Sequence, residues 1–104
     1  MTISLKEGVK MRAVSPTVAI ALLVANSVYA DHGIEDLVVT SVCEGHHSPK
    51  SKHYIGNAFD VRIWDIKKET LDKIVRDMRK ALGSEFDVVL ESDHIHVEYD
   101  PKSA

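Results

Sequence analysis

The chain has a single cysteine, Cys43, and this scarcity limits its covalent chemistry. One thiol cannot form a disulfide within the chain or build a cysteine-based zinc site, and it leaves the redox compartment open. The chain also has little excess of one charge sign, because the formal net charge is only −3 in 104 residues. Such a balance gives no broad positive surface, so we expect neither nucleic acid nor an anionic membrane as a partner.

Long apolar runs, internal repeats, linkers and low-complexity tracts are absent from the sequence as well. The stretch 11–30 resembles a secretory signal, with a basic start, a short apolar run and Val28-Tyr-Ala at its end. Its apolar run is too short to span a bilayer. Ten residues precede it, and cleavage after it would remove a helix, so we expect no cleaved signal peptide. We predict one domain over residues 1–104, with its motif-bearing core at about 15–100.

Hydrophobic periodicity predicts two helices and four strands. Ser15-Pro16 begins a helix that runs to about His32, before Gly33. Its apolar residues are numerous enough to predict heavy burial: Val18, Ile20, Leu22, Leu23, Ala25, Val28 and Tyr29. In residues 1–14 only Leu5, Val9 and Met11 stand out as anchors against the core.

The later elements follow from alternation and helical spacing. We predict strands over 34–42, 58–64, 86–90 and 94–99, a loop over 43–52 and an amphipathic helix over 67–82. The order helix, strand, strand, helix, strand, strand is typical of an α+β domain with a small, mostly antiparallel sheet and two main helices. We expect Trp64 to pack against the core, with a place beside Tyr54 in a substrate groove as the alternative, and His32 to lie at a helix end.

Histidine and aspartate recur in two stretches that could share a metal ion. His53, Asp60 and His96 offer two imidazole nitrogens and one carboxylate, which suit zinc. Three protein ligands leave a fourth position for water, as in catalytic zinc sites. Alternation places Asp60 on the strand face opposite the apolar row, and gives His94 the same face as His96. Each stretch is a weak signal alone, and the two together are a much better one.

These residues carry a resemblance to a known family. The sequence Ser51-x-His53-x-x-Gly56-x-Ala58-x-Asp60, followed by Asp93-His94-x-His96, closely resembles the zinc D-alanyl-D-alanine peptidases. That family shares the hedgehog/DD-peptidase fold with hedgehog signalling domains, and the resemblance covers roughly residues 15–100. The resemblance implies that His53, Asp60 and His96 bind one zinc ion and that Asp93 is the general base. It also implies that His94 lies beside the charge that develops on the substrate, and that Ser51 contacts the substrate or orders the first ligand.

One departure from the family's pattern concerns substrate recognition. Many members carry an arginine shortly after the Thr-Ser pair, where it binds the free carboxylate of a terminal D-alanine. No arginine follows Thr40-Ser41 here, and Lys50, Lys52 and Arg62 are the cations left to replace it. Lysine is a poor substitute for a bidentate arginine. Carboxypeptidase and endopeptidase action on peptidoglycan peptides therefore both stay open.

The resemblance implies zinc-dependent hydrolysis of an amide bond in a peptidoglycan stem or cross-link peptide. The compact domain is similar to phage-encoded members such as endolysins, which act on the bacterial cell wall without a cleaved signal peptide; a secreted or periplasmic enzyme is the alternative. A non-catalytic zinc-containing binding or virion structural module of the same fold is the alternative function. The sequence leaves the oligomeric state open.

Asp93 must lie in a turn, because strict alternation would point it away from His94. Glu98 is either a support for the metal site or a plain surface carboxylate, and His46 and His47 are expected at the rim.

Overall fold

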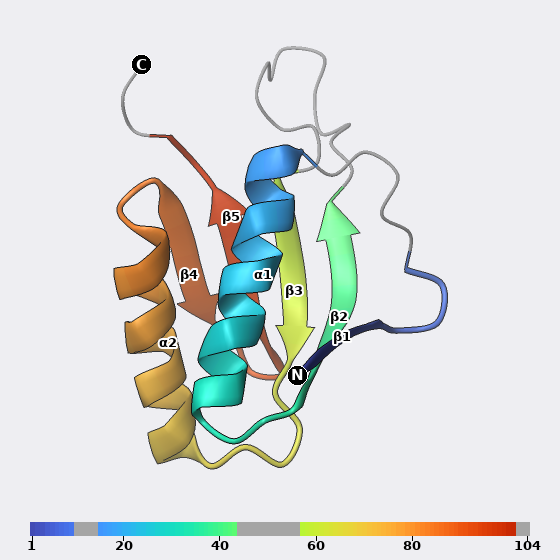
Figure 1. Cartoon of the computed structure of the whole chain (residues 1–104), viewed down its shortest axis with the longest axis vertical. Coiled ribbons are helices and arrows are strands. Elements are labelled where there is room, and N and C mark those ends of the chain that lie inside the picture. Colours follow the sequence, from blue (N-terminus) through green and yellow to red (C-terminus); the bar gives the residue numbers. More distant parts are fainter. Residues whose placement is uncertain (10–14, 44–56, 102–104) are drawn as a thin grey trace.

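The computed structural model describes residues 1–9, 15–43 and 57–101. In this part of the chain it forms an α+β domain with a five-stranded mixed sheet and two helices, α1 and α2, packed on one face (Figure 1). The strand order is β1-β2-β3-β5-β4, with β1 parallel to β2 and the other neighbours antiparallel. The α+β class and both helices are therefore confirmed. The elements are β1 Thr2–Leu5, α1 Pro16–Asp31, β2 Asp36–Cys43, β3 Ala58–Arg62, α2 Lys68–Leu82, β4 Phe86–Leu90 and β5 His94–Tyr99.

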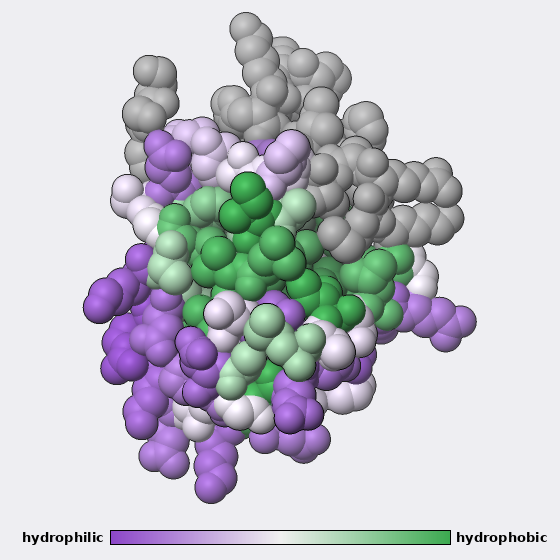
Figure 2. Space-filling model, viewed as in Figure 1, coloured by the Kyte–Doolittle hydropathy of each residue, from purple (hydrophilic) through white to green (hydrophobic). Residues whose placement is uncertain are grey.

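The first helix begins where the sequence predicts and buries a narrower face than expected. The Ser15 hydroxyl accepts a hydrogen bond from the Val18 amide at 3.2 Å, and proline follows the cap. Ile20 and Leu23 are 61% and 62% exposed, so placing them in the buried stripe was wrong. The physical reason is that α1 packs on the sheet and α2 from one side only. Its outer side forms part of the apolar patch in Figure 2.

The strand β1 was not predicted. Its alternation of polar and apolar residues covers only four positions, which is too short to stand out in the sequence, and it forms by pairing in parallel with β2. One oxygen of Asp36 accepts hydrogen bonds from the hydroxyls of Thr2 at 2.6 Å and Ser4 at 2.7 Å. These bonds hold the pKa of Asp36 below its usual range. Beyond β1, Val9 packs against the core as expected, whereas Leu5 is exposed, and Met11 lies outside the described residues.

The second helix is amphipathic as predicted, with Leu71, Ile74, Val75 and Met78 buried. A polar contact joins α2 to the C-terminal end of α1. His32 caps α1, as expected for a helix end, and its Nε2 lies 2.8 Å from an Asp77 oxygen on α2.

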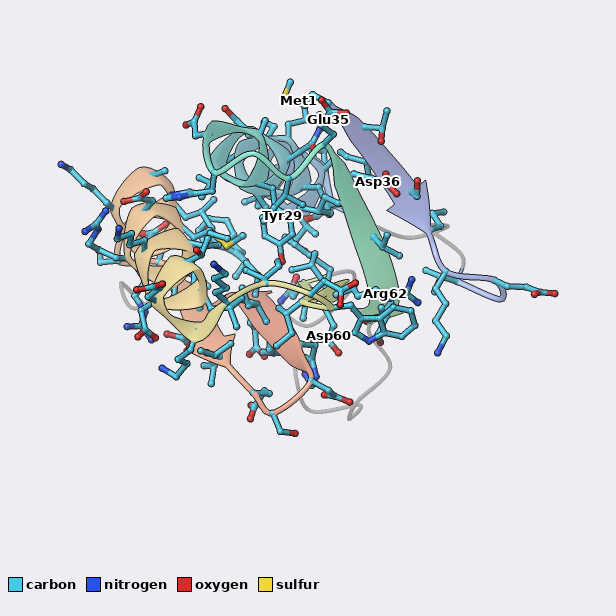
Figure 3. All side chains as sticks on the ribbon, turned by 90° about the horizontal axis from the view of Figure 1, so that it is seen from below. Met1, Tyr29, Glu35, Asp36, Asp60 and Arg62 are labelled. Atoms are coloured by element: carbon cyan, nitrogen blue, oxygen red, sulfur yellow. The ribbon has the colours of Figure 1, made fainter. Side chains whose placement is uncertain are left out.

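Tyr29 connects α1 to the middle of the sheet. Its side chain is almost fully buried between the helix and β3 (Figure 3), and its hydroxyl donates to the carbonyl of Arg62 at 2.9 Å. Burial raises the pKa of this phenol well above its usual value. The last residue of β3 is thereby fixed relative to the core.

Alternation in β3 and β5 separates an apolar face from a polar one. Phe59 and Val61 point toward the helices and are almost fully buried, and so do Ile95 and Val97 of β5. The residues between them carry the polar face: Asp60 and Arg62 on β3, and His94, His96 and Glu98 on β5. Within the described residues, no helix combines the length and apolar character needed to cross a membrane.

Candidate metal and catalytic site

Two of the three predicted metal ligands lie side by side on adjacent strands. Asp60 of β3 and His96 of β5 are directly opposite in the antiparallel register. Asp60 Oδ1 and His96 Nδ1 are 2.7 Å apart, and both side chains are partly buried. A carboxylate oxygen and an imidazole nitrogen are donors that zinc accepts. These two residues therefore fit the donor set that the sequence predicts.

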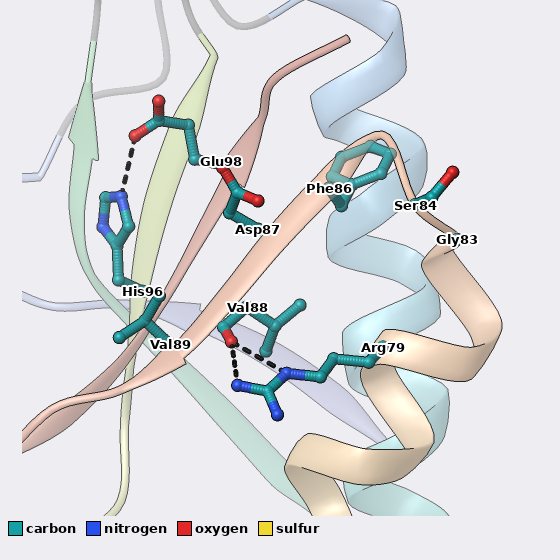
Figure 4. Close-up of a pocket in the computed structure, with 9 residues that line it drawn as sticks. All are labelled: Arg79, Gly83, Ser84, Phe86, Asp87, Val88, Val89, His96 and Glu98. Atoms are coloured by element: carbon teal, nitrogen blue, oxygen red, sulfur yellow. Dashed lines mark hydrogen bonds and ion pairs between the residues drawn. The ribbon is translucent and has the colours of Figure 1, made fainter. Parts of the chain in front are cut away.

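The other nitrogen of His96 is held by Glu98. Glu98 Oε1 lies 3.0 Å from His96 Nε2 (Figure 4), from a position two residues along the same strand face. Burial lowers the pKa of His96, but the hydrogen bonds with Glu98 and Asp60 outweigh this and raise it overall. Of the two readings left open for Glu98, its contact favours support of His96, because it fixes the orientation of the imidazole beside Asp60.

His94 and Asp93 form a second pair beside the first. His94 Nδ1 is 2.6 Å from Asp93 Oδ1, and His94 Nε2 is 3.7 Å from Asp60 Oδ2. Asp93 lies in the bend before β5, as expected, with its side chain 79% exposed. The bond to His94 lowers the pKa of Asp93, so its carboxylate is ionised at neutral pH. The four side chains of Asp93, His94, Asp60 and His96 thus form one continuous row.

Several predicted site residues lie outside the described part of the chain. These are the metal ligand His53, the substrate residue Ser51, the cations Lys50 and Lys52, and the rim histidines His46 and His47. Within residues 1–9, 15–43 and 57–101, no group of three His, Cys, Asp or Glu side chains is placed to hold a metal ion. Of the three predicted metal ligands, only Asp60 and His96 lie among these residues.

Two hollows flank the Asp60–His96 pair. The smaller, of about 260 Å³, is lined by Asp60, Asp93 and His94 together with Arg62, Trp64 and Lys6. The larger, of about 690 Å³, extends toward β4 and α2 and includes His96 and Glu98 (Figure 4). Arg79 closes part of that side by donating two hydrogen bonds to the Val88 carbonyl. Asp60 therefore lines the smaller hollow and His96 the larger one.

Lys6 is the addition that sequence reasoning missed, and Trp64 follows the alternative rather than the preferred prediction. Trp64 is 67% exposed, so the prediction that it packs against the core was wrong. Its ring instead stacks on the guanidinium of Arg62, with 3.7 Å from the Arg62 Cζ to the ring centroid. Lys6 reaches the site because β1, a strand that the sequence analysis did not predict, pairs with β2.

Comparisons of the chain with protein-family models, curated proteins and solved structures gave no match. The resemblance to the zinc D-alanyl-D-alanine peptidases therefore rests on the motif residues, and the hedgehog/DD-peptidase fold stays a prediction.

Proposed function

We propose that the protein is a zinc metallopeptidase that hydrolyses an amide bond in bacterial peptidoglycan peptides. The observation that carries the proposal is the contact between Asp60 and His96. These are two of the three ligands in the motif, they are 36 residues apart in the chain, and their donor atoms lie 2.7 Å apart. A hydrogen bond between His and Asp is common in proteins, but here it joins the two residues that the motif selects and is flanked by Asp93 and His94.

In this proposal His53, Asp60 and His96 hold one zinc ion. When bound, zinc would lower the pKa of a coordinated water toward about 7 and polarise the scissile carbonyl. Glu98 would accept the Nε2 proton of His96, which leaves the Nδ1 lone pair to the metal once zinc displaces the proton shared with Asp60. Ser51 keeps its expected role in contacting the substrate or ordering His53.

Proton transfer falls to Asp93 and His94. The Asp93 carboxylate is ionised, and the hydrogen bond to His94 occupies one of its two oxygens. The second oxygen is available to take a proton from the attacking water and deliver it to the leaving amine. His94 Nε2 points toward Asp60, on the same strand face as the ligand pair. From there a proton on that nitrogen would stabilise negative charge on the substrate oxygen.

The fold supports this proposal in one further respect. The candidate groups lie on β3 and β5, which are central in the sheet and packed from behind by a continuous core. Groups on such strands are held more firmly than groups on loops, as catalysis requires. The bacterial cell wall as target, and a phage origin, rest on the family resemblance.

The test combines metal analysis with digestion of purified peptidoglycan. We expect about one zinc per chain, loss of amide cleavage on chelation, and recovery on adding zinc. Asp93→Ala should keep the zinc and lose turnover, while Glu69→Ala on α2 serves as a matched control that changes neither. Mass spectrometry of the digest identifies the bond that is cut.

Two results would contradict the proposal. A chain that binds no zinc with His53, Asp60 and His96 intact rules out the metal centre. A chain that binds zinc but releases no new amine or peptide from peptidoglycan would favour the alternative, a zinc-containing binding or virion structural module of the same fold.

A further inference from the structure

The outer face of α1 is apolar and exposed in the part of the chain that the structure describes. Ile20 and Leu23 are 61% and 62% exposed, and Figure 2 shows apolar side chains gathered at this place on the surface. No residue from Pro16 to Ala30 carries a charge. A helix that is largely apolar all round is normally covered on every side. The sheet and α2 cover only one side of α1 (Figure 1).

The neighbouring helix shows what an ordinary exposed face looks like in this fold. Every exposed residue of α2 between Lys68 and Lys80 is charged. Both helices lie side by side on the same face of the sheet (Figure 1), so the fold allows either of them a charged outer face. The absence of charge on the outer face of α1 therefore marks this helix as the one that meets a partner.

The exposed residues of α1 follow one line along the helix. Pro16, Ile20, Leu23 and Ser27 are spaced by four, three and four residues, which keeps them on one side. Alternating spacings of this kind form the seam by which two helices pack along their length. Leu23 lies at the middle of α1, which ends at Asp31. Two copies packed antiparallel about that point meet near Leu23 and place Ile20 of one copy opposite Ser27 of the other.

The ends of α1 carry the charge pattern that an antiparallel partner requires. A helix favours negative charge at its N-terminus and positive charge at its C-terminus. The first turn of α1 has no acidic residue, its last turn has no basic residue, and the exposed Asp31 brings the unfavourable sign to its C-terminus. Within the described residues, Asp31 has no ion-pair contact. In an antiparallel pair, each Asp31 lies beside the N-terminus of the other helix, where a carboxylate is favourable.

We infer that the outer face of α1 binds the same face of a second copy of this chain, as an antiparallel helix pair in a two-fold dimer. A charged partner would find no complementary charge between Pro16 and Ala30. A second copy brings both the matching apolar seam and the carboxylate that each helix N-terminus lacks. The contact leaves the polar faces of both sheets free, because α1 covers the face opposite Asp60 and His96. Dimerisation is therefore independent of the proposed peptidase function.

Sedimentation equilibrium of the full chain over about 1 to 500 µM tests the inference. A seam of about four helical turns makes a small interface, so we expect a Kd on the order of 10 to 100 µM. Leu23→Asp should raise the Kd more than about 100-fold, because it sets two like charges against each other in an apolar contact. Lys73→Asp, on the exposed face of α2, is the control and should leave the Kd unchanged. A wild-type chain that stays monomeric at the highest concentration overturns the inference.

Asp31 tests the direction of the two helices. Asp31→Asn should raise the Kd about 3- to 30-fold, from two helix-end contacts. The free energy of unfolding of the monomer, measured in urea at low concentration, should stay the same or increase, because the change removes a negative charge from a helix C-terminus. Lower stability of the monomer with an unchanged Kd would overturn the antiparallel arrangement.

Other occupants of this face give different results. A wild-type chain that remains monomeric and floats with anionic phospholipid vesicles would assign the face to a membrane surface and overturn the dimer. An equal mixture of Leu23→Asp and Leu23→Lys should dimerise more than either variant alone, because only a second copy sets position 23 near itself. If Leu23→Asp fails to fold, Leu23→Ser decides, and it should raise the Kd at least about 10-fold.

Discussion

Removing the carboxylate of Glu98 should weaken zinc binding without unfolding the protein. Among the described residues, Glu98 contacts the candidate site through His96 Nε2, at 3.0 Å. In Glu98→Ala the imidazole is free to rotate and to place its proton on Nδ1, the nitrogen that the metal needs. Loss of such a supporting hydrogen bond typically lowers metal affinity about 10- to 100-fold. That range corresponds to about 1.4 to 2.7 kcal/mol.

A second effect of the same change acts in the opposite direction. The bond to Glu98 is one of the causes that raise the pKa of His96 above its usual value, so in the wild type protons compete with the metal. Removing Glu98 relieves part of this competition, and the relief is largest at low pH. The deficit of Glu98→Ala relative to wild type should therefore grow as pH rises from about 6.5 to 8.5.

The assay is competition with a chromophoric chelator, followed at several pH values. Glu69→Ala is the matched control, because Glu69 lies in the first turn of α2, on the other side of the sheet, and its replacement removes an equal charge. Glu98→Gln should be intermediate, since its amide oxygen still accepts from Nε2. An affinity for Glu98→Ala within about threefold of wild type at pH 8.5 would refute the supporting role of this residue.

Three further predictions concern the scaffold. Asn26 Oδ1 is buried without a partner among the described residues, so Asn26→Leu should raise the free energy of unfolding by about 1 kcal/mol in urea denaturation, and Asn26→Asp should lower it. Tyr29→Phe removes the bond to the Arg62 carbonyl and should cost about 1 kcal/mol in the same assay; no change would show that the bond adds nothing. The hydrogen bond from His32, followed by that from Arg76, holds the pKa of Asp77 below its usual 3.8. Asp77 therefore stabilises the fold above pH 3.8, and this stabilisation is lost as pH falls further. The free energies of unfolding of wild type and Asp77→Asn should differ at neutral pH and converge in acid.

The sequence predicts the fold best where local patterns and tertiary packing agree. The cap at Ser15-Pro16 and the apolar stripe of α2 are local signals, and both elements form where expected. Strand alternation correctly places Asp60 on the polar face, and the turn before β5 correctly accommodates Asp93. The strand β1 has only a weak local signal, an alternation over four residues. Its hydrogen bonds come from β2, 34 residues away at Thr2 and Asp36, and only three-dimensional pairing reveals it.

The same distinction explains which site residues the sequence could identify. Asp60 and His96 are predictable because zinc chemistry restricts the residue types and strand alternation fixes the face. Trp64 is not, because a large aromatic at the end of an apolar strand is usually buried. What keeps Trp64 at the surface is its stacking on Arg62, and Arg62 is on the polar face because it alternates with Val61. The exposed position of Trp64 thus depends on a contact with the neighbouring polar face of the sheet, which the apolar pattern of its own stretch does not reveal.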